Sequence, residues 1–235
     1  PYSLSWIFPV SDADPYKPEN YRFSGFDKGF GAYEDQAYGG LDEVMSGAAQ
    51  VGARVVFQAH TDIGADACNV GSSGDMIGKP IVDPSKWSAV VANVVRHYNM
   101  GILDQNSPGD VPWIDGAKAY NLNHVEFIDE PMGKGGYGDN LSLLADHFGV
   151  FASVLKDKAV FPDFVDGSSF ITLIAPSMVV KSAAEVNSHP IWDFVSALKA
   201  KGTLGNLDVL SYKTRVSTPR ENHAIAAAIR EKMKS

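Results

Sequence analysis

The sequence predicts an α/β fold of the (β/α)8 TIM-barrel type, either incomplete or closed in an unusual way. Short apolar runs rich in β-branched or aromatic residues alternate along the chain with longer stretches of helical period. Such alternation is typical of parallel strands joined by crossover helices. The length of 235 residues, 45% of them hydrophobic, suits one large core. We therefore expect a single barrel-like domain over residues 1–235.

Six segments have the composition of strands, because they are short, apolar and rich in β-branched or aromatic side chains. They cover residues 3–10, 21–23, 54–58, 124–128, 170–175 and 207–212, and the last four are the clearest. Long connections rich in Gly, Asp, Ser and Pro follow two of them, at 61–83 and 131–138. In a barrel the loops after the strands build the active site, so we expect the functional site at that end.

The segments between the strands have the apolar spacing of helices that pack on a sheet. Their apolar stripes run through 41–48, 87–98, 144–155, 191–198 and 225–229. The second helix has a clear start, since Asp83 suits the N-cap and Pro84 the first helical position. The last helix is expected over 219–234.

Charge and composition argue against several classes of partner. The formal net charge is -8 without a basic stripe, which argues against nucleic acids and anionic membranes. No stretch approaches the roughly 18 apolar residues that span a bilayer, so no membrane partner is expected. Cys68 is the only cysteine, which excludes an intrachain disulfide and a cysteine-based zinc cluster.

No cofactor is expected from the glycine motifs. No Gly-x-Gly-x-x-Gly or P-loop sequence follows a predicted strand, and the cluster Gly133-Lys-Gly-Gly136 opens no obvious helix. The chain begins at Pro1 rather than Met. That start fits either removal of a secretion signal or a shortened chain, so the compartment stays open.

The strongest candidate for chemistry is Glu130, in the run His124-Val-Glu-Phe-Ile-Asp-Glu-Pro131. Pro131 cannot donate a ladder hydrogen bond, so it marks the strand end and places Glu130 at the rim. A carboxyl group held there against an apolar wall can stay protonated near neutral pH and act as a general acid. The alternative is an acid in a solvated loop, since loops are rich in such residues.

Asp129-Glu130-Pro131, preceded by Val-Glu-Phe-Ile, resembles the Asn-Glu-Pro strand end of clan A glycoside hydrolases, including xylosidase-like, arabinofuranosidase-like and glucuronidase-like members. Other segments resemble strands and helices of that clan in the same order, at 21–25, 40–57, 87–98, 170–176 and 208–213. The resemblance implies a TIM barrel, a carbohydrate substrate and Glu130 as the acid/base of a retaining mechanism.

Three positions depart from the clan's pattern. Asp129 stands where the clan has an asparagine that contacts the sugar, and Lys213 stands where it usually has a histidine. The clan's nucleophile is a glutamate that ends the seventh strand, whereas this sequence closes with a predicted helix before Ser235. The sequence therefore leaves open a fragment, a barrel completed by a second chain or by self-association, and a non-catalytic carbohydrate-binding or scaffold relative.

Further residues expected to bind substrate follow predicted strands or carry aromatic rings. They are Asp129, His60, Asp62, Tyr137, Tyr212, Lys213 and Trp6. His60 and Asp62 end the third predicted strand, but one histidine and one acid are too few for a metal site. A last alternative is an unrelated α/β enzyme with a carboxylate metal site at Asp129 and Glu130.

Overall fold

Four parallel strands form the centre of the described structure. The computed structural model describes residues 4, 8, 13–17, 20–21, 41–59, 80–100, 122–133, 136–157, 171–216 and 218–234. Within them the strands are β1 (Val56–Gln58), β2 (His124–Glu126), β3 (Thr172–Val179) and β4 (Val209–Lys213). They pair in the order β1-β2-β3-β4, and every pair is parallel. Their carboxyl ends therefore point to one edge of the sheet, which we call the carboxyl edge.

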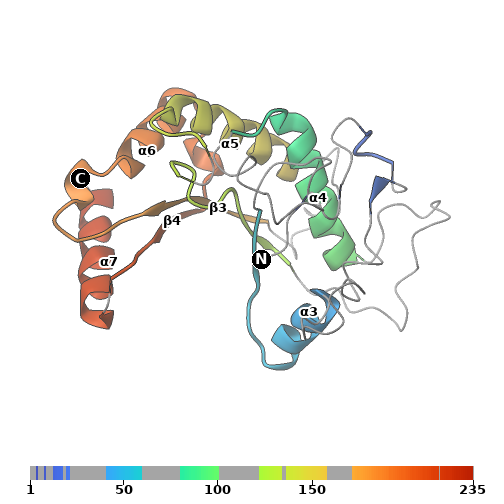
Figure 1. Ribbon diagram of the computed structural model, residues 1–235, viewed down its shortest axis with the longest axis horizontal. Helices are drawn as coiled ribbons and strands as arrows, with labels where there is room; N and C mark the ends of the chain where they lie inside the picture. Colours follow the sequence, from blue (N-terminus) through green and yellow to red (C-terminus); the bar gives the residue numbers. More distant parts are fainter. Residues whose placement is uncertain are drawn as a thin grey trace, which may run out of the picture.

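Helices alternate with these strands along the chain. They are α3 (Leu41–Gln50), α4 (Pro84–Met100), α5 (Leu141–Leu155), α6 (Ile191–Ala200) and α7 (Pro219–Met233), with short 3-10 helices at Val186–Ser188 and Leu204–Asn206. Figure 1 shows α4, α5 and α6 in a row along one face of the sheet, and α7 beside the far end of β4. Among the described residues, no helix is both long and apolar enough to cross a bilayer.

The strand order explains why three helices lie on the same face. Crossovers between parallel strands are almost always right-handed, so strands that pair in sequence order place successive helices on one side. A doubly wound sheet would reverse its order and put helices on both faces. The predicted α/β fold with a parallel sheet is confirmed, while the four described strands do not show a closed eight-stranded barrel.

Most predicted elements are found close to their expected bounds. β3 is longer than predicted, since it continues past Ala175 to Val179 through a register shift between Ala175 and Met178. The strand predicted over 3–10 is wrong where residues are described. There the Phe8 amide donates to the Leu4 carbonyl at 2.8 Å, which is the i to i+4 hydrogen bond of a helical turn.

The main core lies between the sheet and the row of helices. Trp87 of α4 and Phe151 of α5 pack against Phe127, which directly follows β2, with ring centroids 5.6 and 5.1 Å from the Phe127 ring. Phe148 joins them with its centroid 5.6 Å from that of Phe127. All four rings are fully buried. Alternate strand residues such as Val125 point into this core, so their neighbours along each strand point to the opposite face.

A smaller core attaches α7 to the ends of β3 and β4. Ile225 and Ile229 of α7 are buried against Val180 and Val186. Thr218 begins the helix with a complete capping box, because its hydroxyl accepts from the Glu221 amide while the Glu221 carboxylate accepts from the Thr218 amide. α7 is thereby held beside the carboxyl edge.

Candidate functional site

Glu130 lies at the carboxyl edge, four residues beyond the last residue of β2. Its backbone has a φ of +43°, in the left-handed region that side chains other than glycine rarely adopt. A tight turn follows, in which the Gly133 amide donates to the Glu130 carbonyl at 2.9 Å. The Glu130 side chain is only 14% exposed. The chain thus turns sharply here and holds a carboxylate at the rim.

Arg215, two residues beyond β4, is an ion-pair partner of Glu130. Its Nη2 atom lies 3.2 Å from Oε1 and 3.3 Å from Oε2 of the carboxylate. The guanidinium is 71% exposed, so water screens much of the attraction. The guanidinium is always cationic, so the contact is a charge-assisted hydrogen bond at the rim.

Asp129 and Lys213 form a second ion pair beside the first. The Asp129 side chain is 8% exposed and that of Lys213 is 34% exposed, and the ammonium contacts Oδ1 directly. Removing a carboxylate from water costs free energy, so a buried aspartate requires such a partner. Two residues that the sequence predicts as substrate ligands therefore bind each other.

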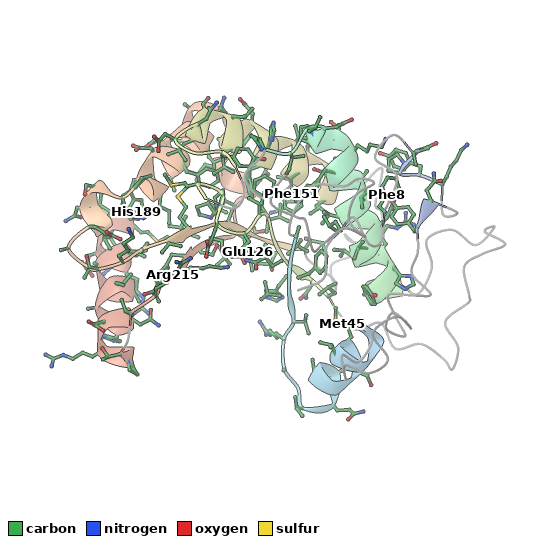
Figure 2. All side chains as sticks on the ribbon, viewed as in Figure 1. Phe8, Met45, Glu126, Phe151, His189 and Arg215 are labelled. Carbon is green, nitrogen blue, oxygen red and sulfur yellow. The ribbon has the colours of Figure 1, made fainter. Side chains whose placement is uncertain are left out.

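Both ion pairs connect β2 to β4 across the strand between them. Two spacings between neighbouring strands amount to about 9.5 Å, which suits the long side chains of lysine and arginine. Arg215 lies on the face of the sheet away from α5 and α6, as Figure 2 shows. The pairs place two adjacent carboxylates and two cationic groups at one point of the carboxyl edge.

Further polar side chains lie on the face of the sheet opposite the helices. One comes from each strand, and we call the four residues the polar row: Gln58, Glu126, Ser177 and Ser211. The Gln58 amide donates to Oε2 of Glu126 and lies 3.4 Å from the Ser177 hydroxyl. The Ser177 backbone amide donates to the Ser211 hydroxyl at 3.0 Å. Figure 2 shows Glu126 on this face and Phe151 among the helices.

The side chains of the two predicted tyrosine ligands form hydrogen bonds to helices. Tyr137 is 3% exposed, and its hydroxyl bonds Nδ1 of His147 in α5 at 2.8 Å. Its ring is therefore almost fully enclosed by the protein. The Tyr212 hydroxyl donates to the Asn222 side chain in α7 at 3.3 Å, so the Tyr212 side chain points toward α7.

Three predicted ligands, Trp6, His60 and Asp62, lie outside the described residues. Within the part of the chain that is described, no group of three or more His, Cys, Asp and Glu side chains is arranged to hold a metal ion. Asp129 and Glu130, the carboxylates of the metal alternative, are instead paired with Lys213 and Arg215.

Sequence reasoning missed Arg215 and the polar row. A signal for the row is present, because the alternation in each strand places Glu126 opposite Val125 and Phe127, on the face away from the helices. Arg215 gives no such signal, since it follows β4 in an irregular segment.

Chemically, the arrangement offers carboxylates that accept hydrogen bonds, cations that donate them, and hydroxyl and amide groups that do both. These are the groups that bind a hydroxylated ligand, and a rim carboxylate can also transfer a proton. Comparisons with models of protein families, with curated proteins and with solved structures found no match to this chain.

Proposed function

We propose that the chain binds a glycan at the carboxyl edge and that Glu130 acts there as the acid/base of a retaining glycosidase reaction on a (β/α) barrel. The observation that carries the proposal is the position of Glu130. Its carboxylate is mostly buried just beyond β2 and is held by a group from beyond β4. The resemblance of the Asp129-Glu130-Pro131 strand end to clan A glycoside hydrolases supplies the reaction class.

In such a reaction Glu130 has two tasks. In the first step its carboxylic acid gives a proton to the glycosidic oxygen while a second carboxylate attacks the anomeric carbon. In the second step the Glu130 carboxylate takes a proton from the water that releases the sugar. The Arg215 guanidinium is largely exposed, so it can move aside when Glu130 meets the glycosidic oxygen.

The second carboxylate of a retaining pair lies about 5–5.5 Å from the acid/base. Asp129 is adjacent in sequence but is held by Lys213. We therefore expect the nucleophile from a further strand or from a partner chain that completes the barrel. Pairing of an edge strand of the sheet with a second copy of the chain would supply the nucleophile in the same way.

A carbohydrate-binding protein without the chemistry is the second candidate. The pairing of both rim carboxylates with cations favours it, because Lys213 and Arg215 already occupy the two carboxylates. This candidate keeps the glycan at the same edge. It differs only in predicting affinity without turnover.

The test measures binding and cleavage separately on three 4-nitrophenyl glycosides, the β-D-xyloside, α-L-arabinofuranoside and β-D-glucuronide. Calorimetry measures binding, and release of 4-nitrophenol measures cleavage. Glu130→Gln is expected to bind at least one glycoside but to cleave it roughly 10²–10⁴-fold more slowly than wild type. Asp139→Asn, an exposed acid in the same loop, is the matched control and should behave as wild type.

Each outcome separates the candidates. Binding with cleavage that depends on Glu130 supports the enzyme, and binding without cleavage by the wild-type chain supports the binding protein. Cleavage by Glu130→Gln as fast as by wild type would remove Glu130 from the mechanism. Absence of both binding and cleavage for glycosides and for longer xylan and arabinan fragments would overturn both candidates.

A further inference from the structure

We propose that the polar row is a subsite for the hydroxyl groups of an uncharged sugar ring, with Glu126 as its central acceptor. The inference rests on the proposed glycan binding, and it adds the class of sugar and the residues that select it. None of the four residues belongs to the ion pairs at the rim. Each comes from a different strand, so the row crosses the whole described sheet.

The row is unusual for a parallel sheet. Strands of such sheets are normally buried on both faces and are apolar on both. Here the residues that face the helices are apolar, as in Phe57, Val125 and Leu210. The opposite face carries the polar row in the half that is nearer the carboxyl ends of the strands. Polar side chains at such positions cost free energy unless they are hydrogen-bonded or in contact with water or a ligand. The pattern therefore fits a face that receives a polar occupant.

Hydrogen bonds within the row leave part of its capacity unused. Among the described residues, Gln58 is the group that bonds the Glu126 side chain, and it does so through Oε2. No hydrogen bond from the described part of the chain reaches Oε1 of Glu126 or the amide oxygen of Gln58, so both atoms can accept from a ligand. Gln58, Glu126 and Ser211 are half-buried rather than fully enclosed, so a ligand can reach them.

The chemistry of the row selects an uncharged, hydroxylated ligand. A carboxylate accepts hydrogen bonds only, and neighbouring sugar hydroxyls can donate to it. The negative charge of Glu126 repels a phosphorylated or carboxylated sugar at this position. The nearest cation along β4 on the same face is Lys213, and it is held by Asp129. The row therefore favours a neutral pentose or hexose over a uronic acid.

The experiment uses the Glu130→Gln chain as background, so that binding is measured without cleavage. Xylotriose and arabinotriose are the uncharged probes, and a glucuronic acid disaccharide is the charged probe. Adding Glu126→Gln, which keeps the shape of the side chain, should weaken binding of the better uncharged probe roughly tenfold. Adding Ser211→Ala should weaken it roughly threefold to tenfold. Asp193→Asn, which removes an exposed charge from α6, should change nothing.

The preference for uncharged sugars is a second readout. Glu126→Gln removes the repulsion, so the ratio of affinities for the uncharged and the charged probe should fall roughly tenfold. Circular dichroism and thermal unfolding verify that each variant is folded. If Glu126→Gln does not fold, the binding measurements on Ser211→Ala test the subsite.

The outcomes distinguish this inference from the proposed function. Unchanged affinity in both folded variants, or tighter binding of the glucuronic acid probe by the background chain, overturns the subsite while glycan binding stands. Absence of binding of every probe by wild type and by the background chain overturns the proposed function and the subsite together.

Discussion

The ammonium of Lys213 contacts the carboxylate of Asp129 and thereby joins the end of β4 to the segment beyond β2 across β3. The two residues are 84 positions apart in the chain. Beside them, Arg215 contacts Glu130 and also connects the segments beyond β4 and β2 across β3. The two pairs differ in burial, and this difference leads to different expectations for stability.

Lys213→Met should destabilise the fold, because it leaves the Asp129 carboxylate buried without its cation. Loss of one partner from a fully buried pair costs about 3–5 kcal/mol, and the partial exposure of Lys213 reduces the expected cost to about 1–3 kcal/mol. Urea unfolding measures the free energy of unfolding. Lys181→Met, at an exposed position, is the control. Equal stability of Lys213→Met and wild type would show that the pair is not structural.

Arg215→Ala should leave the free energy of unfolding within about 0.5 kcal/mol of wild type, because the guanidinium is largely exposed. If Glu130 transfers protons as proposed, the same variant should change kcat on a cleaved glycoside more than it changes KM. Urea unfolding and steady-state kinetics on one protein sample give both numbers. A large loss of stability with unchanged kinetics would assign Arg215 to the fold alone.

Phe127→Ala should be the most damaging of these substitutions. The ring is fully buried among Trp87, Phe148 and Phe151, and its removal leaves a cavity that the neighbouring rings cannot fill. Such changes typically cost about 3–5 kcal/mol. Phe127→Leu, which keeps more of the volume, should lose clearly less. Thermal unfolding compares the two, and equal melting temperatures would contradict a tightly packed ring cluster.

Thr218→Ala should destabilise α7 by about 1 kcal/mol, since it removes the hydroxyl that caps the first turn. The effect should be local. Hydrogen exchange should speed up for amides of α7 while those of α5 keep their protection. Thr218→Ser retains the hydroxyl and should restore the protection of α7. Uniformly faster exchange in both helices would mean that α7 unfolds together with the main core.

Tyr21 gives an expectation for alkaline pH. Its hydroxyl donates to the Pro15 carbonyl at 2.7 Å and accepts from the Asn93 amide at 2.8 Å. Burial raises the pKa of Tyr21 above its ordinary value of 10.0. The unfolded chain therefore loses this proton above pH 10 while the folded chain keeps it, so the free energy of unfolding falls as the pH rises.

Tyr21→Phe should reduce that fall, which is measured as the difference in urea unfolding between pH 9 and about pH 11. Tyr16→Phe is the control, because Tyr16 is exposed and its charge is only a minor cause of the raised pKa of Tyr21. It should retain the wild-type slope of stability against pH. The same slope in all three proteins would show that Tyr21 is not buried in solution.

Local patterns determined much of the fold. The helical stripes and the short β-branched runs predict α3 to α7 and the four strands, because periodicity shows directly which side of an element is buried. Asp83 and Pro84 likewise mark the start of α4, where Asp83 accepts from the Lys86 amide at 3.0 Å. At Leu4 and Phe8, the described residues of 3–10, the strand prediction failed because a short apolar run fits a buried helical turn equally well.

The sequence predicted Glu130 at the end of a strand, since Pro131 cannot continue one. In the structure β2 ends at Glu126, and Glu130 follows four residues later in a turn. The sequence did not predict the partner of Glu130. Arg215 is 85 positions away, and the contact depends on the sheet order that places β4 two strands from β2. The burial of Tyr137 against His147, and the polar row, were likewise decided by the tertiary structure. Periodicity is a local property of the chain, whereas ion pairs and hydrogen bonds between strands depend on which side chains the packed sheet brings within a few ångströms.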